Sequence, residues 1–329
     1  MINIVGQERA KKTLALIAES FFAANRQIPT LGVFGSSGLG KTFLVEQFAK
    51  AINAQLIYIN GSSVKDPMAF RAFFKDAYEN QNEHHVVFID ECHMLPRKVQ
   101  ENMLSVLESP AVLCTIAPKD LGLVDCVDGK RYIEKGDIVR EKLPTNMSFV
   151  LATTDPAMLK NTILSRVRKI HLDPYTEQEK AEIAKNHLAT LGLKIDDATA
   201  QKIAQRSRSI RHLKGEICET MIDVHNVFTV DIDAALSVVD DMLGLDGDGA
   251  TLLDKNYLRF LAANEIAGID TIAGYLKIDK KEVTTHIEPF LMEKGWIAIT
   301  GKGRILTKTG YNKVLGTPVQ NEDTNVVCS

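Results

Sequence analysis

The sequence predicts an α/β protein whose first half is a layered domain on a parallel sheet, followed by a helical unit and a winged helix. Three observations support this fold class. Short apolar runs typical of buried parallel strands alternate with helical patterns in the first half. After Pro174 helical spacing continues without such runs. The glycine-rich stretch LGLDGDGAT then precedes a third unit that ends in two strand-like runs.

The first unit, residues 1–174, is expected to hold the parallel sheet. Its strand-like runs are LGVF (Leu31–Phe34), LIYI (Leu56–Ile59), VVFI (Val86–Ile89) and FVLA (Phe149–Ala152). Helical patterns such as Thr42–Ala51 and Pro67–Tyr78 lie between them. Strands that alternate with helices indicate parallel strands joined by crossover helices.

The second unit, residues 175–245, is predicted to be a small all-helical domain. Thr176-Glu177-Gln178-Glu179 has the pattern of a capping box, which starts a helix. Further helices are expected near residues 198–205, 210–225 and 231–243. Glycines 244, 247 and 249 predict a flexible junction after this unit.

The third unit, residues 246–316, has the element order of a winged helix. Helices are expected near residues 254–264, 271–276 and 280–293. Two strand-like runs, WIAIT and RILTKT, then flank Gly301-Lys302-Gly303. The polar tail, residues 317–329, is predicted to be disordered.

Composition is that of an ordinary globular protein, with 45% hydrophobic and 25% charged residues. No apolar run approaches the roughly 18 residues that span a bilayer, and the N-terminus lacks signal-peptide features. The five scattered cysteines argue against a disulfide framework or a zinc site. We therefore expect a cytoplasmic protein without a membrane partner. A net charge of −3 excludes nucleic-acid binding by bulk charge, so any DNA contact would be local.

The segment GSSGLGKT has the sequence and the setting of a phosphate loop, because it follows a strand and opens a helix. Glycines let successive backbone N–H groups point into one concavity, and the helix N-terminus favours phosphate. Lys41 could reach the β and γ phosphates, and the Thr42 hydroxyl could bind Mg²⁺. The predicted nucleotide-binding residues are Gly35, Ser36, Ser37, Gly38, Leu39, Gly40, Lys41 and Thr42. ATP and Mg²⁺ are the predicted cofactors.

Two carboxylates end the strand VVFIDE, at the edge where ligands bind in open α/β sheets. Asp90 is predicted to hold Mg²⁺ partly through water, as this cation prefers. Glu91 is predicted to polarise the attacking water. Thr154 ends the next strand-like run, FVLATTD, and could orient that water.

Several other polar residues near these motifs have weaker signals. Arg166 in LSRVRK and Arg211 in RSRSIRHLK become candidates only if the protein transfers phosphoryl groups, where an arginine can stabilise transition-state charge. No partner spacing supports a metal site at three nearby histidines, so these are interpreted as loop or partly buried residues: His84, His85 and His93. Cys92 is interpreted as a small packing residue.

Taken in order, IVGQERAKKTL, GSSGLGKT, FIDECHML, ATTD…LSR and SIRHL resemble the AAA+ ATPases over about the first 245 residues. The resemblance implies a P-loop NTPase large domain with a helical lid. It places Thr154 at the sensor-1 position, Arg166 at the arginine finger and Arg211 at the sensor-2 position on the lid. Gly6 and Gln7 match the segment near the adenine.

The third unit resembles the winged helix of the RuvB family, the motors that drive branch migration of Holliday junctions, through LDKNYLRFL, GIDTIAGYL, IEPFLMEKGWIAIT and GKGRILTKTGYNKVLG. This resemblance implies an ATP-dependent DNA motor that acts as a ring, expected to be a hexamer, in recombination and repair. Lys302 and Arg304 match the family's basic wing, so they are the expected DNA contacts. Residues 251–316 carry ten Lys and Arg against seven Asp and Glu, which gives modest support.

Three departures from the family pattern matter. Ser36 and Ser37 replace paired prolines, which should leave binding by the backbone intact. The chain starts almost at IVGQER, so part of the nucleotide pocket could differ. An Asp128-Gly129 turn predicts a hairpin, where the family docks the junction-binding protein RuvA. The different hairpin sequence leaves the identity of this partner open, and a plain surface hairpin is an equal alternative.

Two alternative functions stay open. A clamp-loader-like ATPase of DNA replication would share ATTDPAMLKNTILSR, but clamp loaders end in a helical collar instead of a winged helix. A non-catalytic DNA-binding regulator would use ATP as a switch, and the intact Asp90, Glu91 and Arg166 argue against it.

Overall fold

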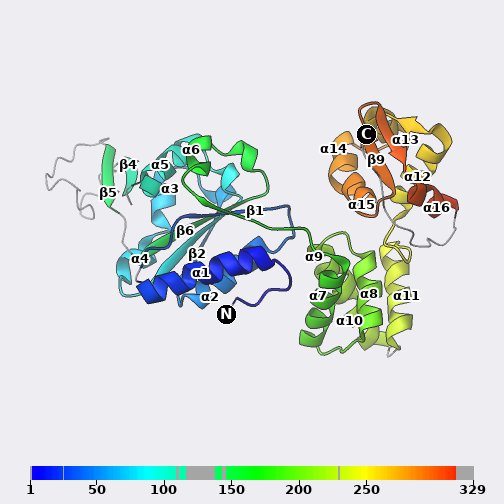
Figure 1. The fold of residues 1–329 in the computed structure, drawn as a ribbon, viewed down its shortest axis with the longest axis horizontal. Helices are drawn as coiled ribbons and strands as arrows, with labels where there is room; N and C mark the ends of the chain where they lie inside the picture. The colour runs from blue at the N-terminus through cyan, green and yellow to red at the C-terminus, as the bar shows by residue number, and fades with distance from the viewer. Residues whose placement is uncertain are drawn as a thin grey trace. The chain divides into compact units, whose positions relative to one another are not determined.

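The computed structural model describes residues 2–24, 26–108, 111–115, 138–142, 146–228 and 230–315. The chain forms two compact units, with the boundary between Glu179 and Lys180 (Figure 1). Within the described ranges, no helix has both the length and the apolar character that crossing a membrane requires. The predicted fold class is confirmed, because a parallel-sheet domain is followed by a helical unit and a winged helix. The domain limits at residues 174, 245 and 316 stay predictions.

The first unit is built on a five-stranded sheet with the order β2-β3-β6-β1-β7. All neighbouring strands in it are parallel. The strands are β1 (Leu31–Phe34), β2 (Gln55–Asn60), β3 (His85–Asp90), β6 (Met147–Thr153) and β7 (Arg168–His171). The sequence did not predict β7, because only Ile170 of its four residues is buried.

Alternating side chains of each central strand face two separate cores. In β3, Val86 and Phe88 join one core, while Val87 and Ile89 join the other. The first core packs under α1 (Glu8–Ala24) and α2 (Lys41–Ala51). The second packs under helices on the opposite face (Figure 1): α3 (Pro67–Ala72), α4 (Lys75–Glu79), α5 (Arg97–Glu108) and α6 (Asn161–Leu164). Helices on both faces explain why the strands read as continuous apolar runs.

An antiparallel pair, β4 (Ala111–Thr115) and β5 (Ile138–Lys142), is inserted between α5 and β6. Its register pairs Ala111 with Lys142 and Thr115 with Ile138. Antiparallel pairing agrees with a hairpin in this stretch. The predicted turn at Asp128-Gly129 and the tail at residues 317–329 lie outside the described residues.

The helical unit contains α7 (Glu177–Thr190), α8 (Asp197–Arg206), α9 (Ile210–His212), the π-helical η5 (Leu213–Cys218), α10 (Glu219–Phe228) and α11 (Ile232–Leu243). Thr176 and Glu179 form the predicted capping box at the start of α7, since the Thr176 amide donates to Glu179 and the Glu179 amide donates back to Thr176. The core of the unit consists of fully buried side chains that include Leu188, Ile203 and Met221.

The winged helix contains α12 (Leu252–Asn264), β8 (Ile266–Ala267), α13 (Ile269–Leu276), α14 (Lys280–Glu282), the π-helical η6 (Val283–Ile287), α15 (Glu288–Glu293), β9 (Ile297–Thr300), β10 (Gly303–Leu306) and α16 (Lys308–Leu315). Its sheet has the antiparallel order β8-β10-β9. Tyr257, Phe290 and Trp296 lie in the core between helices and sheet. The sequence predicted neither the two-residue β8 nor α16.

The junction at residues 244–250 differs from the flexible linker that its glycines predicted. Asp246 accepts hydrogen bonds from the backbone N–H groups of Asp248 and Ala250, at 3.1 and 2.9 Å. The ammonium groups of Lys255 and Lys313 lie 3.2 and 3.0 Å from its carboxylate. These bonds tie the junction to the winged helix. The glycines alone could not reveal that the Asp246 carboxylate fixes the loop through hydrogen bonds and ion pairs.

Candidate functional site

The predicted phosphate loop lies between β1 and α2, at the carboxyl end of the central sheet. Gly38 and Gly40 have φ of +82° and +85°, in the left-handed region that L side chains rarely adopt. Gly40 is also the N-cap of α2 and has no side-chain cap. Its conformation therefore leaves the first N–H groups of α2 at the end of the helix, where they can bind an anion.

Lys41 starts α2, and only 7% of its surface is exposed. Its ammonium donates to the carbonyl oxygens of Gly35 and Ser36 at 2.9 and 3.1 Å. A buried charge is stable only where polar groups surround it. The cation is thus held within the curve of the loop, where a phosphate could replace the carbonyls as its partner.

The two predicted acids lie at the end of β3, where Asp90 is the last strand residue and Glu91 follows it, at the same edge of the sheet. The strand β6 separates β1 from β3, so the loop and the acids lie about two strand spacings apart, on the order of 10 Å. One Asp90 oxygen accepts from the Glu91 amide at 3.0 Å, and the other accepts from the Tyr58 hydroxyl at 3.2 Å. Burial raises the pKa of Tyr58, and the charge of the Asp90 carboxylate raises it further. The sequence did not predict a role for Tyr58, because its only distinguishing feature is that it lies on the strand next to β3.

Glu91 adopts a left-handed backbone conformation, with φ of +45° and ψ of +48°. Such a conformation in a residue other than glycine is strained and occurs often at functional sites. Gly61 makes room for it, since a Cβ there would lie 2.4 Å from the Glu91 carbonyl oxygen. The turn directs the Glu91 side chain toward β6 instead of along β3.

Two side chains, one after β6 and one after β3, contact the Glu91 carboxylate. Thr154 donates to Glu91 Oε2 from its hydroxyl at 3.0 Å and from its amide at 3.2 Å. His93 Nδ1 lies 3.2 Å from the same oxygen and 2.8 Å from the hydroxyl of Thr153, which is fully buried. The structure therefore brings two predicted residues together. It adds His93, whose sequence signal could only have been its position two residues after the acid.

The predicted adenine segment uses its side chain for another contact. The Gln7 amide group donates to the Asp173 carbonyl at 2.7 Å and accepts from the Asp173 N–H at 3.0 Å. Gly6 has φ of +62°, and a Cβ there would lie 2.2 Å from Glu179 Oε1. Only the backbone of this segment is left to contact a base. The predicted role of Gly6 and Gln7 in nucleotide binding stays a prediction.

Tyr175 connects the chain after β7 to the phosphate loop. Its hydroxyl donates to the Leu39 carbonyl at 3.2 Å. Burial raises the pKa of Tyr175 above its ordinary, already alkaline value. Sequence reasoning missed this residue, because a single tyrosine after a proline has no distinctive spacing.

The two candidate arginines are exposed at the ends of short helices. Arg166 follows α6, and its guanidinium donates to the Thr162 carbonyl at 2.8 Å. Arg211 lies in α9, whose N-cap Ser209 accepts from the His212 amide. An exposed arginine held by its own helix suits contact with another surface.

The two candidate DNA contacts have different surroundings. Lys302 is exposed in the turn between β9 and β10. Arg304 instead donates to both oxygens of Glu288, at 2.7 and 3.2 Å, and Glu288 also accepts from the buried Tyr257 hydroxyl at 3.0 Å. Because this pair is mostly buried, the Arg304 guanidinium supports the winged-helix core instead of facing solvent.

The other sequence candidates near the acids make packing contacts instead of facing the site. Burial lowers the pKa of His84, which contacts Ser148, and His85 is buried at the start of β3. Cys92 is buried, and burial raises the pKa of its thiol to about 12. A thiol that stays protonated agrees with the interpretation of Cys92 as a packing residue.

Two family models match this chain. The ATPase family associated with various cellular activities (AAA) matches residues 31–175. The RuvB C-terminal winged helix domain matches residues 247–315. The first match contains the phosphate loop and both acids, which supports nucleotide binding at this edge of the sheet.

Curated relatives and solved structures match nearly the whole length. The chain is 28% identical over 322 residues to the Holliday junction branch migration complex subunit RuvB of Anaplasma marginale (strain Florida), covering 96% of this chain and 91% of that protein. It is 26% identical over 314 residues to the subunit of the same name from Fusobacterium nucleatum subsp. nucleatum, covering 93% and 89%. The structure of the Thermotoga maritima RuvB Holliday junction branch migration motor matches with a TM-score of 0.69 and 25% identity, covering 96% of each chain.

Proposed function

The chain is a RuvB-like AAA+ ATPase, and from this premise we propose that it is an ATP-driven motor that moves the branch point of Holliday junctions. Relatives named as branch migration subunits share both the ATPase domain and the winged helix. A clamp loader is disfavoured, because the C-terminal unit is a winged helix.

One observation carries the proposal most directly. The phosphate loop follows β1, and the two acids lie at the end of β3. Thr154 follows β6, the strand between them, and contacts Glu91. Residues from three neighbouring strands thus converge where a triphosphate bound to the loop would end. This arrangement argues against a DNA-binding regulator that binds ATP without hydrolysing it.

Each residue of the site has a proposed task. The backbone of residues 35–42 binds the phosphates, and Lys41 neutralises them. The Thr42 hydroxyl and the Asp90 carboxylate are hard oxygen ligands that suit Mg²⁺, and Tyr58 and the Glu91 amide orient Asp90. When bound, Mg²⁺ would neutralise charge on the phosphates.

Hydrolysis requires a group that orients and polarises water beside the terminal phosphate. Glu91 is the proposed group, and Thr154 fixes the direction of its carboxylate. Gly6 and Gln7 are proposed to border the adenine through their backbone. Arg211 is proposed to respond to the terminal phosphate from the helical unit.

We infer that the active form is a ring, with six subunits as the expected number. The exposed position of Arg166 supports this, because an arginine that completes a neighbour's site must reach beyond its own surface. The antiparallel pair β4–β5 is the proposed docking site for a RuvA-like junction-binding protein.

The winged helix is the proposed DNA-binding domain. Lys302 would contact phosphate from the exposed wing turn. Arg304, paired with Glu288, is proposed to position the wing without touching DNA. The domain limit at residue 174 separates the parts that would move relative to one another, and the limits at residues 245 and 316 bound the winged helix.

The proposal is tested with a synthetic four-way junction and ATP. The full chain, with and without a junction-binding partner, should separate the junction into two duplexes only while ATP is hydrolysed. A primed template carrying a sliding clamp is the comparison substrate. Clamp loading without junction movement would favour the clamp-loader alternative, and ATP binding without turnover would favour the regulator.

A further inference from the structure

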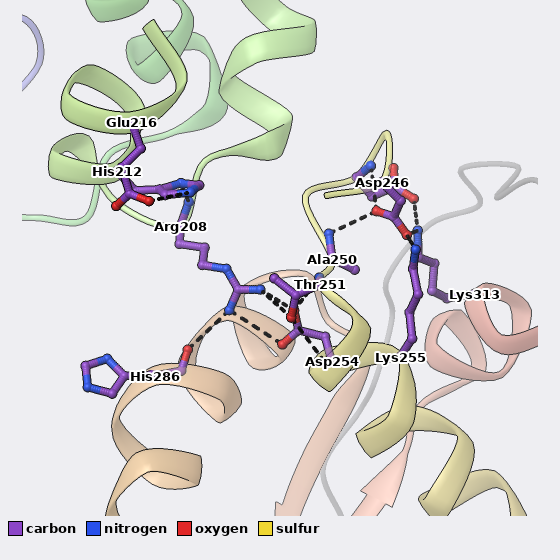
Figure 2. Close-up of polar contacts among 11 residues, drawn as sticks. Arg208, His212, Glu216, Asp246, Ala250, Thr251, Asp254, Lys255, His286 and Lys313 are labelled. Carbon is purple, nitrogen blue, oxygen red and sulfur yellow. Dashed lines mark hydrogen bonds and ion pairs between the residues drawn. The ribbon is translucent and has the colours of Figure 1, made fainter. Parts of the chain in front are cut away.

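Arg208 extends from the helical unit into the winged helix, where it makes several contacts (Figure 2). Its guanidinium pairs with the Asp254 carboxylate and lies 3.4 Å from both the Thr251 hydroxyl and the His286 carbonyl. It also stacks over the Phe290 ring, 4.4 Å from the centroid. Asp254 is fully buried, so its charge depends on such partners.

Two other ion or hydrogen-bond contacts join the same surfaces. The ammonium of Lys180 pairs with the Glu293 carboxylate. The ammonium of Lys294 donates to the Gln205 carbonyl at 2.8 Å. Both winged-helix partners lie at the end of α15, so the helical unit holds this helix at several separate points.

The backbone of Arg208 is also fixed. Its N–H donates to His212 Nδ1 at 3.3 Å, and the His212 amide donates to Ser209 Oγ at 3.1 Å. Burial lowers the pKa of His212, which favours the neutral ring that can accept this bond. Arg211 lies in the same short turn, three residues after Arg208. The same turn therefore contains Arg211, which is proposed to respond to the terminal phosphate, and Arg208, which binds the winged helix.

The junction between the two parts is packed against the same region. Gly249 has φ of +82°, and a Cβ there would lie 2.4 Å from the Arg206 carbonyl oxygen. The Arg206 guanidinium pairs with Asp240 at 2.6 and 2.8 Å, entirely within the helical unit. Arg206 and Arg208 are thus two arginines in mostly buried ion pairs, and of these two only Arg208 pairs with the winged helix.

We propose that Arg208 is a positioning residue that fixes the winged helix to the helical unit, so that movement of Arg211 is transmitted to DNA. This inference rests on the proposed function and adds its coupling element. Without the Arg208 contacts, movement of the helical unit would not be transmitted fully to the winged helix. ATP would then be hydrolysed with little movement of DNA.

The test compares Arg208→Met with the matched control Arg206→Met in the full chain. For Arg208→Met, ATP turnover without DNA should stay within about twofold of wild type, while junctions separated per ATP fall about tenfold. Arg208→Lys should restore part of this ratio, because it can still pair with Asp254. Arg206→Met should keep the wild-type ratio even if its melting temperature falls. A wild-type ratio in Arg208→Met would overturn the proposal.

A second readout separates this inference from the proposed function. Spin labels at exposed Glu182 and Arg259 report the distance between α7 and α12 without DNA. The distance distribution should be narrow and equal with ADP and with a non-hydrolysable ATP analogue, and it should broaden in Arg208→Met. The double variant Arg208→Met/Asp254→Asn, which leaves no unpaired buried charge, should broaden it equally. A distribution that shifts with nucleotide in wild type, or stays narrow in both variants, contradicts the rigid joint even if junction movement fails for other reasons.

Discussion

The hydroxyl and the amide of Thr154 donate to the same oxygen of Glu91, at 3.0 and 3.2 Å. Two donors on one carboxylate oxygen fix both the position and the direction of the acid. The left-handed backbone of Glu91 directs the side chain to this contact. The acid that should activate water is therefore oriented from the strand next to the phosphate loop.

Replacing Thr154 by Val removes the hydroxyl and keeps the amide. We expect kcat for ATP hydrolysis to fall about ten- to a hundredfold with little change in KM, because orientation of the acid matters most in the transition state. Thr154→Ser should retain most of the activity. Steady-state ATPase kinetics measure this, and equal losses in the Ser and Val variants would show that the hydroxyl is not the cause.

His93 contacts the same Glu91 oxygen from the other side, at 3.2 Å. His93→Ala should lower kcat about three- to tenfold at unchanged KM, since the acid loses one of its three contacts. His93→Asn should recover part of the rate, because its amide can replace Nδ1. His84→Ala, before the opposite end of β3, is the control, and a matching loss there would remove the special role of His93.

The wing offers a comparison between a buried and an exposed basic residue. Arg304→Ala leaves the buried Glu288 carboxylate without its main partner, so the free energy of unfolding should fall by about 3 kcal/mol. Lys302→Ala should change stability by less than about 0.5 kcal/mol. Chemical denaturation of the two variants measures the difference.

In DNA binding the order should be reversed: substitution of Lys302 should have the larger effect, and substitution of Arg304 the smaller one. Lys302→Ala should reduce the slope of log affinity against log salt concentration by about one per subunit, as expected for the loss of one phosphate contact. Arg304→Lys, which keeps a cation beside Glu288, should leave this slope unchanged. If the Arg304 variant lost the slope and the Lys302 variant kept it, the assignment of the wing would be reversed.

Asp246 predicts a pH-dependent contribution to stability. Burial alone would raise its pKa, but the Ala250 amide and the Lys313 ammonium outweigh burial and lower it below the ordinary value of 3.8. A carboxyl with a lowered folded pKa stabilises the fold above its unfolded pKa, and this contribution is lost as pH falls through the folded value. Wild type should therefore be more stable than Asp246→Asn at pH 7, by about 1–2 kcal/mol. Thermal unfolding should show the difference shrinking below about pH 4, and a difference that grows in acid would contradict this assignment.

Local signals account for the parts that the sequence predicted well. The phosphate loop and the acid pair each lie in one short segment, where strand, turn and helix signals coincide. The Gln7 contact with Asp173 joins residues 166 positions apart, so no local pattern could reveal it. The same holds for Arg304, whose basic character suggested DNA, while its partner Glu288 is a buried residue at the start of α15.

The contacts of Arg208 with the winged helix were likewise not predictable from the sequence. The segment of residues 206–211 contains three arginines, and nothing in that segment shows which partner each one has. The partners Asp240 of Arg206 and Asp254 of Arg208 come from different helices. Tertiary contacts also explain β7, which is paired to β1 although three of its residues are exposed. Residue type predicted charge in these places, but only the fold assigned partners.

The most direct test of the site is ATP binding and ATP turnover measured together for wild type, Glu91→Gln and the control Glu83→Gln, which lies in the loop before β3 at its opposite end. Wild type and Glu83→Gln should hydrolyse ATP at similar rates. Glu91→Gln should bind ATP with similar affinity and turn it over at least about a hundredfold more slowly. Turnover of Glu91→Gln within twofold of wild type would contradict the assignment of this carboxylate, and with it the proposed catalytic site.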